Sequence, residues 1–148
     1  MVLEDPLKGR AVLISECTRD GLLSFPEIRD SYLQLYPAYT PDRVVTDMIK
    51  PLICGVRTIA VLGTWCGDSK LNLPGLLKVF DVLKIPENDI RFLCVDGRKT
   101  AGPGLIDHLN IEFVPTFIFF RHNRELGRII ERPLISPEED LLMILNIK

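Results

Sequence analysis

The sequence predicts an α/β sandwich built on a mixed sheet, and three observations support this class. From residue 57 onward, the segments follow the order strand, helix, strand, helix, strand, strand, helix. Strand–helix–strand units form parallel pairs, and a closing hairpin adds an antiparallel edge. The 148 residues are 47% hydrophobic and 26% charged, which is typical of one globular domain with one core. We therefore expect a central sheet of roughly four or five strands flanked by helices.

Residues 1–55 are expected to form a mainly helical extension that packs on a core domain of residues 56–148. Within the extension, residues 10–16 fit either a short strand or a helical turn, because they hold the apolar run Ala-Val-Leu-Ile. The periodicity alone does not decide between these two readings of that segment.

Helix-start signals predict two helices in this extension. Ser24 is followed by Glu27 three residues later, a capping box that opens a helix to about Tyr36. A second helix starts at Thr40-Pro41, and Pro51 shortens or bends its last turn. Its apolar residues recur at helical spacing in two adjacent rows: Val44, Met48 and Leu52, then Val45, Ile49 and Ile53.

The first half of the core domain is predicted from apolar patterning. Residues 58–62 form a continuous apolar run, which is typical of a strand buried on both faces. Residues 67–84 carry an apolar side at helical spacing, and Pro86 ends this helix. A second strand over 90–95 ends at the turn-prone Asp96-Gly97.

The second half closes the sheet with a hairpin. A short helix is expected around residues 104–109. The strands over 116–120 and 126–131 are separated by His122-Asn123, the best hairpin turn in the chain. A capping box at Ser136, with proline next to it, opens a terminal helix that completes over 140–147.

Charge and cysteine content narrow the function classes. Lys and Arg number 18 against 20 Asp and Glu, a net charge of −2 that favours neither nucleic acid nor anionic lipid as a partner. No apolar stretch approaches the ~20 residues of a membrane span, and the acidic start lacks the pattern of a signal peptide, so we expect a cytoplasmic protein. The thiols should then be reduced, and their spacing predicts no zinc site: Cys17, Cys54, Cys66 and Cys94.

The segment that contains Cys66 places a thiol at the edge of the sheet where α/β proteins have their ligand-binding and catalytic sites. Cys66 lies between the predicted strand over 58–62 and the helix over 67–84, at the carboxyl edge of the sheet. The unpaired N–H groups and the dipole at a helix start favour the thiolate. Ser69, one turn further on, is expected to donate a hydrogen bond to the sulfur, whereas the carboxylate of Asp68 opposes ionisation. The residue types do not show which effect prevails.

The run Trp65-Cys66-Gly67-Asp68-Ser69-Lys70 resembles the active-site turn of the thioredoxin family, usually Trp-Cys-Gly-Pro-Cys-Lys. Pro74 stands where the family has a helix-kinking proline, and Val114-Pro115-Thr116 resembles its cis-proline loop. The resemblance covers about residues 57–147. It implies a thioredoxin fold, with Cys66 as nucleophile and Ser69 supporting it. The implied substrate surface consists of Trp65, Gly67, Asp68, Val114 and Pro115.

Three departures change the chemistry that the resemblance implies. Ser69 replaces the resolving cysteine, Asp68 replaces a common proline, and Ala60 occupies the place of a buried aspartate. Without a resolving thiol, a mixed disulfide on Cys66 has to be released by an external thiol such as glutathione or by a substrate thiol. An iron–sulfur site like that of monothiol glutaredoxins is disfavoured, because Asp68 stands where their Cys-Gly-Phe-Ser motif has phenylalanine.

The prediction is therefore a monothiol exchange protein that acts on protein or glutathione mixed disulfides. It needs no metal or bound cofactor, and its partners are thiols and disulfides. The alternative is a redox-inactive module that uses the groove between Cys66 and Pro115 to bind a partner protein. Cys94 is expected to be an inert core residue. Cys17 is a minor candidate for a remote resolving thiol that folds over Cys66.

Overall fold

The computed structural model describes residues 1–5 and 9–146, and these residues form an α/β sandwich. In chain order its helices, short 3₁₀ turns (η) and strands are β1 (Val2–Asp5), β2 (Arg10–Leu13), β3 (Ser15–Cys17), α1 (Arg19–Ser24), α2 (Pro26–Leu35), α3 (Arg43–Ile49), η1 (Lys50–Leu52), β4 (Val56–Leu62), α4 (Gly67–Val82), η2 (Glu87–Asp89), β5 (Ile90–Cys94), β6 (Thr116–Arg121), β7 (Arg124–Ile130) and α5 (Pro137–Asn146).

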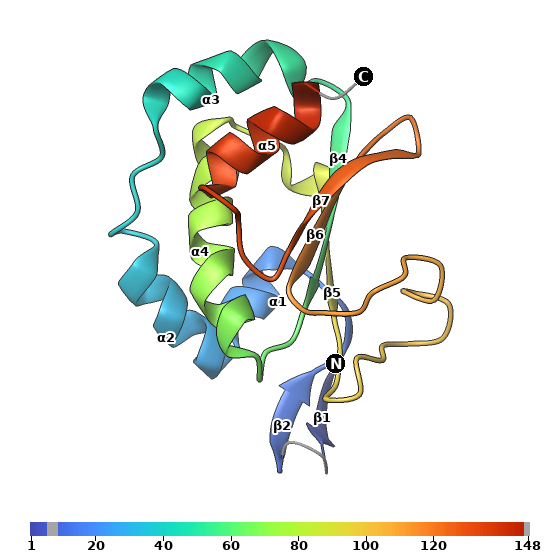
Figure 1. Cartoon of the computed structure of the whole chain (residues 1–148). Coiled ribbons are helices and arrows are strands. Elements are labelled where there is room, and N and C mark those ends of the chain that lie inside the picture. The colour runs from blue at the N-terminus through green and yellow to red at the C-terminus, as the bar shows by residue number, and fades with distance from the viewer. Residues whose placement is uncertain (6–8, 147–148) are drawn as a thin grey trace.

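The described strands form a mixed five-stranded sheet in the order β3-β5-β4-β6-β7, beside a separate two-stranded hairpin of β1 and β2. β4 and β5 run parallel, as their connection through α4 predicts, and the other neighbours in the sheet are antiparallel. The helices lie on one side of this sheet, and the irregular segment between β5 and β6 lies on the other (Figure 1). The predicted fold class is confirmed, and the arrangement is consistent with a thioredoxin-like sandwich.

Each face of the sheet has its own core because side chains alternate along the strands. Ala60 and Phe117 face the helices, where they pack with buried residues of α4 such as Leu77. Val61 and Ile118 face the opposite way and pack under the segment that precedes β6. Cys66 and Trp65 pack against this second core, which therefore forms one wall of the site described below.

The described part of the extension, within residues 1–55, contains the helices α1, α2 and α3 that give it a mainly helical character, and it also contains three short strands. Its residues 10–13 form β2, and residues 15–17 form β3, which pairs antiparallel with β5 at one edge of the main sheet. The strand reading of residues 10–16 is therefore the correct one. The hairpin of β1 and β2 lies at the end of the molecule where α4 begins (Figure 1).

The capping box predicted at Ser24 does not form. Ser24 is the last residue of α1, and its hydroxyl donates to the carbonyl of Asp20. The next helix, α2, begins at Pro26 with Phe25 as its N-cap, since proline suits the first helical position and leaves no N–H unpaired there. Glu27 is thereby free for the ion pairs described below.

The predicted apolar rows of α3 are only partly buried. Asp42 caps α3 by accepting hydrogen bonds from the N–H groups of Val44 and Val45. Ile49 is fully buried, but Val44 is 69% exposed and Met48 is 52% exposed. The row of Val45, Ile49 and Ile53 packs against the core, whereas Leu52 is the one member of the other row that does so.

Gly102-Pro103-Gly104 introduces turns rather than the short helix expected around residues 104–109. Gly104 has a φ of +77°, a left-handed conformation that glycine adopts readily and that breaks a helix. Ile106 and Leu109 nevertheless remain buried in the second core. The helix expected around residues 104–109 is therefore wrong, although two apolar residues of this segment contribute to the core.

The predicted hairpin and terminal helix are confirmed. His122 and Asn123 both have positive φ, as a type I′ turn between β6 and β7 requires. Ser136 accepts a hydrogen bond from the N–H of Glu139 at the start of α5. The last residue predicted in that helix, 147, lies outside the described residues. No helix in the described part of the chain is long and apolar enough to cross a membrane.

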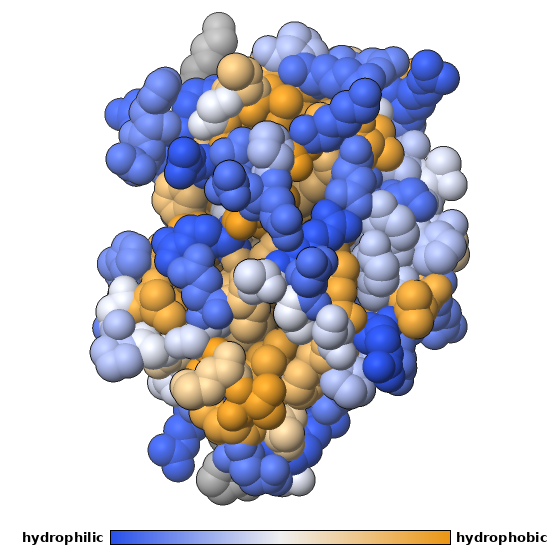
Figure 2. All heavy atoms as spheres, turned by 180° about the vertical axis from the view of Figure 1, so that it is seen from behind, coloured by the Kyte–Doolittle hydropathy of each residue, from blue (hydrophilic) through white to orange (hydrophobic). Residues whose placement is uncertain are grey.

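The surface seen from behind is largely hydrophilic, with a hydrophobic patch in its lower half (Figure 2). This patch lies at the height of the β1–β2 hairpin in Figure 1, because the two views differ only by rotation about the vertical axis. Met1 precedes β1 and is 71% exposed, and Val2, the first residue of β1, is 57% exposed.

Candidate functional site

Cys66 stands at the junction between β4 and α4, as the sequence predicts. It is the N-cap residue of α4, a helix of 16 residues, and its side chain is half-buried. The thiol donates a hydrogen bond to the carbonyl oxygen of Val114, 3.3 Å away. The peptide bond between Val114 and Pro115 is cis. The structure therefore brings Cys66 together with the predicted proline loop, although 48 residues separate Cys66 from Val114.

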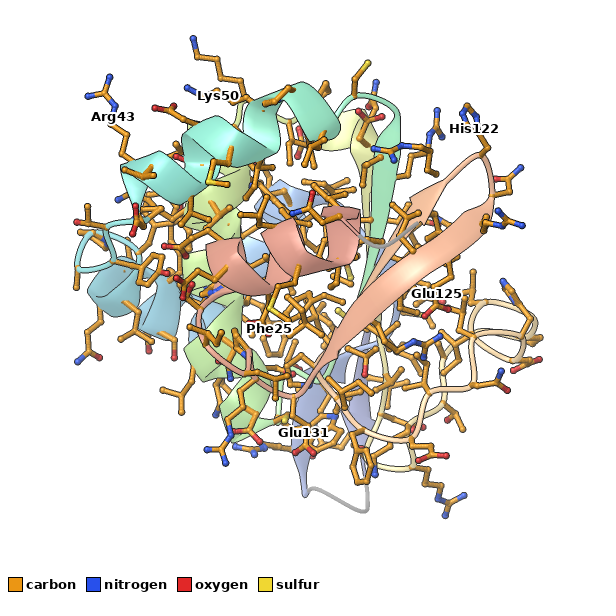
Figure 3. All side chains as sticks on the ribbon, turned by 45° about the horizontal axis from the view of Figure 1, so that its top comes forward. Phe25, Arg43, Lys50, His122, Glu125 and Glu131 are labelled. Carbon is orange, nitrogen blue, oxygen red and sulfur yellow. The ribbon has the colours of Figure 1, made fainter. Side chains whose placement is uncertain are left out.

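Two hydrogen bonds to backbone carbonyls hold this proline loop, one from a backbone N–H and one from a side-chain hydroxyl. The N–H of Glu131, directly after β7, donates to the carbonyl of Pro115 at 2.6 Å. Glu131 lies at the end of the β6–β7 hairpin opposite to its tip at His122 (Figure 3). The Thr116 hydroxyl donates to the carbonyl of Phe113 at 2.6 Å. Phe113 is 49% exposed beside the loop, and its only sequence signal was its position before Val114.

Ser69 does not make the predicted contact with Cys66. It is 0% exposed, and its hydroxyl oxygen accepts a hydrogen bond from the N–H of Gly63 at 3.2 Å. Within the described residues, no hydrogen bond joins Ser69 to the Cys66 sulfur, so Ser69 supports the turn rather than the thiol. Gly67 is exposed and Asp68 half-buried, both at the start of α4.

The side chain of Trp65 is held in place by one hydrogen bond and by packing. The indole N–H donates to the carbonyl of Val95 at 3.0 Å, and the ring packs against the second core. The ring covers Gly63 so closely that a Cβ at residue 63 would lie 2.6 Å from an indole carbon. Glycine at 63 therefore leaves the space that the Trp65 indole occupies.

Gly63→Ala should reduce the free energy of unfolding by about 1–3 kcal/mol, because the added methyl group must displace the indole or shift the turn. Gly67→Ala is the matched control, since a Cβ there would meet nothing within 4 Å. Urea denaturation of both variants measures the difference. An equal change in the two variants would show that Trp65 does not need a glycine at position 63.

A charged network that the sequence did not predict surrounds the turn. Arg10, the first residue of β2, donates to the carbonyl of Trp65 at 3.0 Å and pairs with Glu27 at 3.2 Å. Lys70 of α4 lies 3.6 Å from the same Glu27 oxygen. Two cations and one carboxylate thus connect β2, α2 and α4 beside Cys66. Arg10, Glu27 and Lys70 are distant in sequence, and no motif links the three, so only the fold brings them together.

The other cysteines do not contact Cys66. The sulfur of Cys17 lies 3.6 Å from that of Cys94 on the neighbouring strand, which argues against Cys17 as a resolving thiol for Cys66. Cys54 is exposed after η1. Across residues 1–5 and 9–146, no group of three or more His, Cys, Asp or Glu side chains is placed to hold a metal ion.

Comparison with known proteins reveals structural likeness only. No protein-family model matches the chain, and no curated protein matches it. An HIV epitope-scaffold crystal structure is similar at a TM-score of 0.56 and 19% identity, covering 81% of this chain and 82% of that chain. A protein of unknown function from Pseudomonas aeruginosa is similar at a TM-score of 0.54 and 17% identity, covering 88% and 96%. At these identities the likeness concerns the fold alone.

Proposed function

We propose that this protein exchanges thiols and disulfides through a single nucleophilic cysteine, Cys66, on protein or glutathione mixed disulfides. The observation that carries the proposal is the position of the Cys66 thiol. It caps the start of α4 and lies 3.3 Å from the carbonyl of Val114, next to the cis-proline. This combination places the thiol at a helix N-terminus and beside the cis-proline loop, and the motif resembles that of thioredoxins.

The start of α4 supplies the electrostatic support for this reaction. The first N–H groups of a helix have no partner within the helix, and the positive end of the dipole favours an anion. In the structure the Cys66 side chain makes no capping hydrogen bond to these N–H groups, but as the N-cap residue Cys66 directly precedes them in the chain. Arg10 and Lys70 add positive charge near the turn, partly offset by Glu27.

The reaction then proceeds in two exchanges. The Cys66 thiolate attacks one sulfur of the substrate disulfide, forms a Cys66 mixed disulfide and releases the other sulfur as a thiolate that takes up a proton. A second thiol, such as glutathione, loses its proton and attacks the mixed disulfide. This step releases the bound group and regenerates Cys66. The thiol must come from outside the turn, because Ser69 cannot perform this attack.

We infer that a substrate approaches Cys66 from the side of the Val114 carbonyl, where the neighbouring Phe113 is 49% exposed. An extended peptide next to Pro115 gains affinity from backbone hydrogen bonds, a mode that does not require a particular sequence. Trp65 closes the other side of the thiol and is held by its bond to Val95. We infer that the groove recognises the backbone near the reacting sulfur rather than a specific side chain.

Competition between Cys66 and Cys54 tests this function without any mutation. Cys54 is exposed, whereas Cys66 is half-buried, so accessibility alone favours Cys54. We expect a glutathionylated peptide to modify Cys66 at least ~10-fold faster than Cys54, because the unpaired N–H groups at a helix start stabilise negative charge that develops beside them. Acid quenching followed by peptide mass spectrometry measures the fraction of Cys54 and of Cys66 that is modified at each time. If Cys54 reacts faster, the exchange function is overturned and the groove is left as a peptide-binding surface.

A further inference from the structure

The second notable arrangement of thiols lies away from Cys66, between two neighbouring strands of the sheet. Cys17 is on β3, the edge strand, and Cys94 is on β5 beside it. Their sulfurs are 3.6 Å apart, within hydrogen-bonding distance. Cys17 is half-buried, whereas Cys94 is 0% exposed. One thiol of the pair is thus within reach of a reagent, and the other lies directly behind it.

The surroundings of the two sulfurs divide their roles. The hydrogen bond with Cys94 lowers the pKa of the Cys17 thiol to about 7, even though partial burial opposes this shift. The same hydrogen bond, together with burial, raises the pKa of Cys94. The chain's amino terminus further favours the Cys17 thiolate, and Glu16 disfavours it. Because Cys17 is the accessible thiol of the pair and its pKa is lowered, Cys17 is the nucleophile, and the buried Cys94 beside it is the thiol that attacks in turn.

We propose that Cys17 and Cys94 form a second thiol site, which reacts with a low-molecular-weight disulfide such as oxidised glutathione and closes into a reversible disulfide. In the first step, the Cys17 thiolate attacks the reagent, forms a mixed disulfide and releases one thiolate, which is protonated. In the second step, Cys94 loses its proton, attacks the Cys17 sulfur and releases the second thiol. The protein dithiol is oxidised, and one disulfide is reduced to two thiols.

The register of the strands explains why this disulfide is reversible. Cys17 stands opposite Phe92, and Cys94 stands opposite Ser15, so the two cysteines are diagonal rather than directly paired. Diagonal neighbours are farther apart than directly opposed residues, so closing the bond has to pull the strands slightly together. A strained disulfide is a stronger oxidant and is reduced more readily.

This site does not depend on the proposed role of Cys66. The experiment uses the full chain with Cys54→Ser and Cys66→Ser, which leaves only the thiols of the pair. We expect oxidised glutathione to remove two hydrogens from the folded protein and to yield a linked peptide containing Cys17 and Cys94. Dithiothreitol then restores the reduced mass. Failure in this background leaves the exchange function of Cys66 untouched, because Cys66 is absent.

Two controls make the result decisive. Cys94→Ala in the same background keeps Cys17 and stops at a glutathione adduct. In denaturant the parent chain closes at least ~10-fold more slowly, because the fold no longer holds the sulfurs together. A stable glutathione adduct on Cys17 in the folded parent chain would overturn the proposal. So would unmodified cysteines, or equal closure rates in folded and unfolded protein.

Discussion

Cys66→Ser lowers the rate of exchange with a glutathione mixed disulfide by about 100-fold or more, because a serine hydroxyl is hardly ionised near neutral pH and is a poor nucleophile toward sulfur. The substitution is nearly isosteric, and the hydroxyl can still donate to the carbonyl of Val114. The fold should therefore persist, so the loss reflects chemistry rather than unfolding.

The measurement is the release of glutathione from a glutathionylated peptide in the presence of excess reduced glutathione. Cys54→Ser is the matched control, because it removes an exposed thiol outside the site and should leave the rate within about 2-fold. Circular dichroism before each assay verifies folding. A Cys66→Ser protein that turns over as fast as the parent would exclude Cys66 as the nucleophile.

Much of the fold is predictable because the relevant signals are local. The apolar run that becomes β4, the proline after α4 and the left-handed pair His122-Asn123 each act within a few residues. The parallel pairing of β4 with β5 then follows from the length of the connection through α4. These elements agree with the prediction because propensity and tertiary packing favour the same conformation.

The elements that were missed are those in which tertiary contacts override a local signal. Ser24 and Glu27 have capping-box spacing, yet Glu27 instead pairs with Arg10 and Lys70, which come from other elements. The strand β3 is only three residues long and is stabilised by pairing with β5, which lies about seventy-five residues further along the chain. No window of sequence contains that partner.

The features of the candidate site also separate into those with a local sequence signal and those that depend on tertiary contacts. Cys66 at a helix start is visible from the order of strand and helix, but its contact with Val114 was expected only from the family resemblance. The predicted bond from Ser69 to the sulfur is absent, and the Ser69 hydroxyl oxygen instead accepts a hydrogen bond from the backbone N–H of Gly63, which orients the side chain toward the turn. A short polar side chain near a chain turn often bonds to the backbone, and this local competitor was overlooked.

Ser69→Cys should convert the monothiol site into a dithiol site. Residue 69 is in the first turn of α4, one turn after Cys66, and its side chain is already buried beside the turn. The new thiol can attack a mixed disulfide on Cys66, so we expect the lifetime of that intermediate to shorten by at least ~10-fold, with a disulfide forming between positions 66 and 69. By the sequence resemblance, Ala60 stands where thioredoxins have a buried aspartate, so we expect the new thiol to have no carboxylate there to help remove its proton.

Ser69→Ala is the control that separates this chemistry from stability. Both variants weaken the hydrogen bond from the N–H of Gly63, since sulfur is a poor acceptor and alanine offers none, at a cost of about 1 kcal/mol. Only the cysteine variant gains a resolving group. The mixed disulfide is followed by mass spectrometry after acid quenching, without added thiol. Because the bond to Gly63 is weakened in both variants, it cannot cause a difference between them. Equal lifetimes would therefore mean that a thiol at position 69 does not reach the mixed disulfide on Cys66.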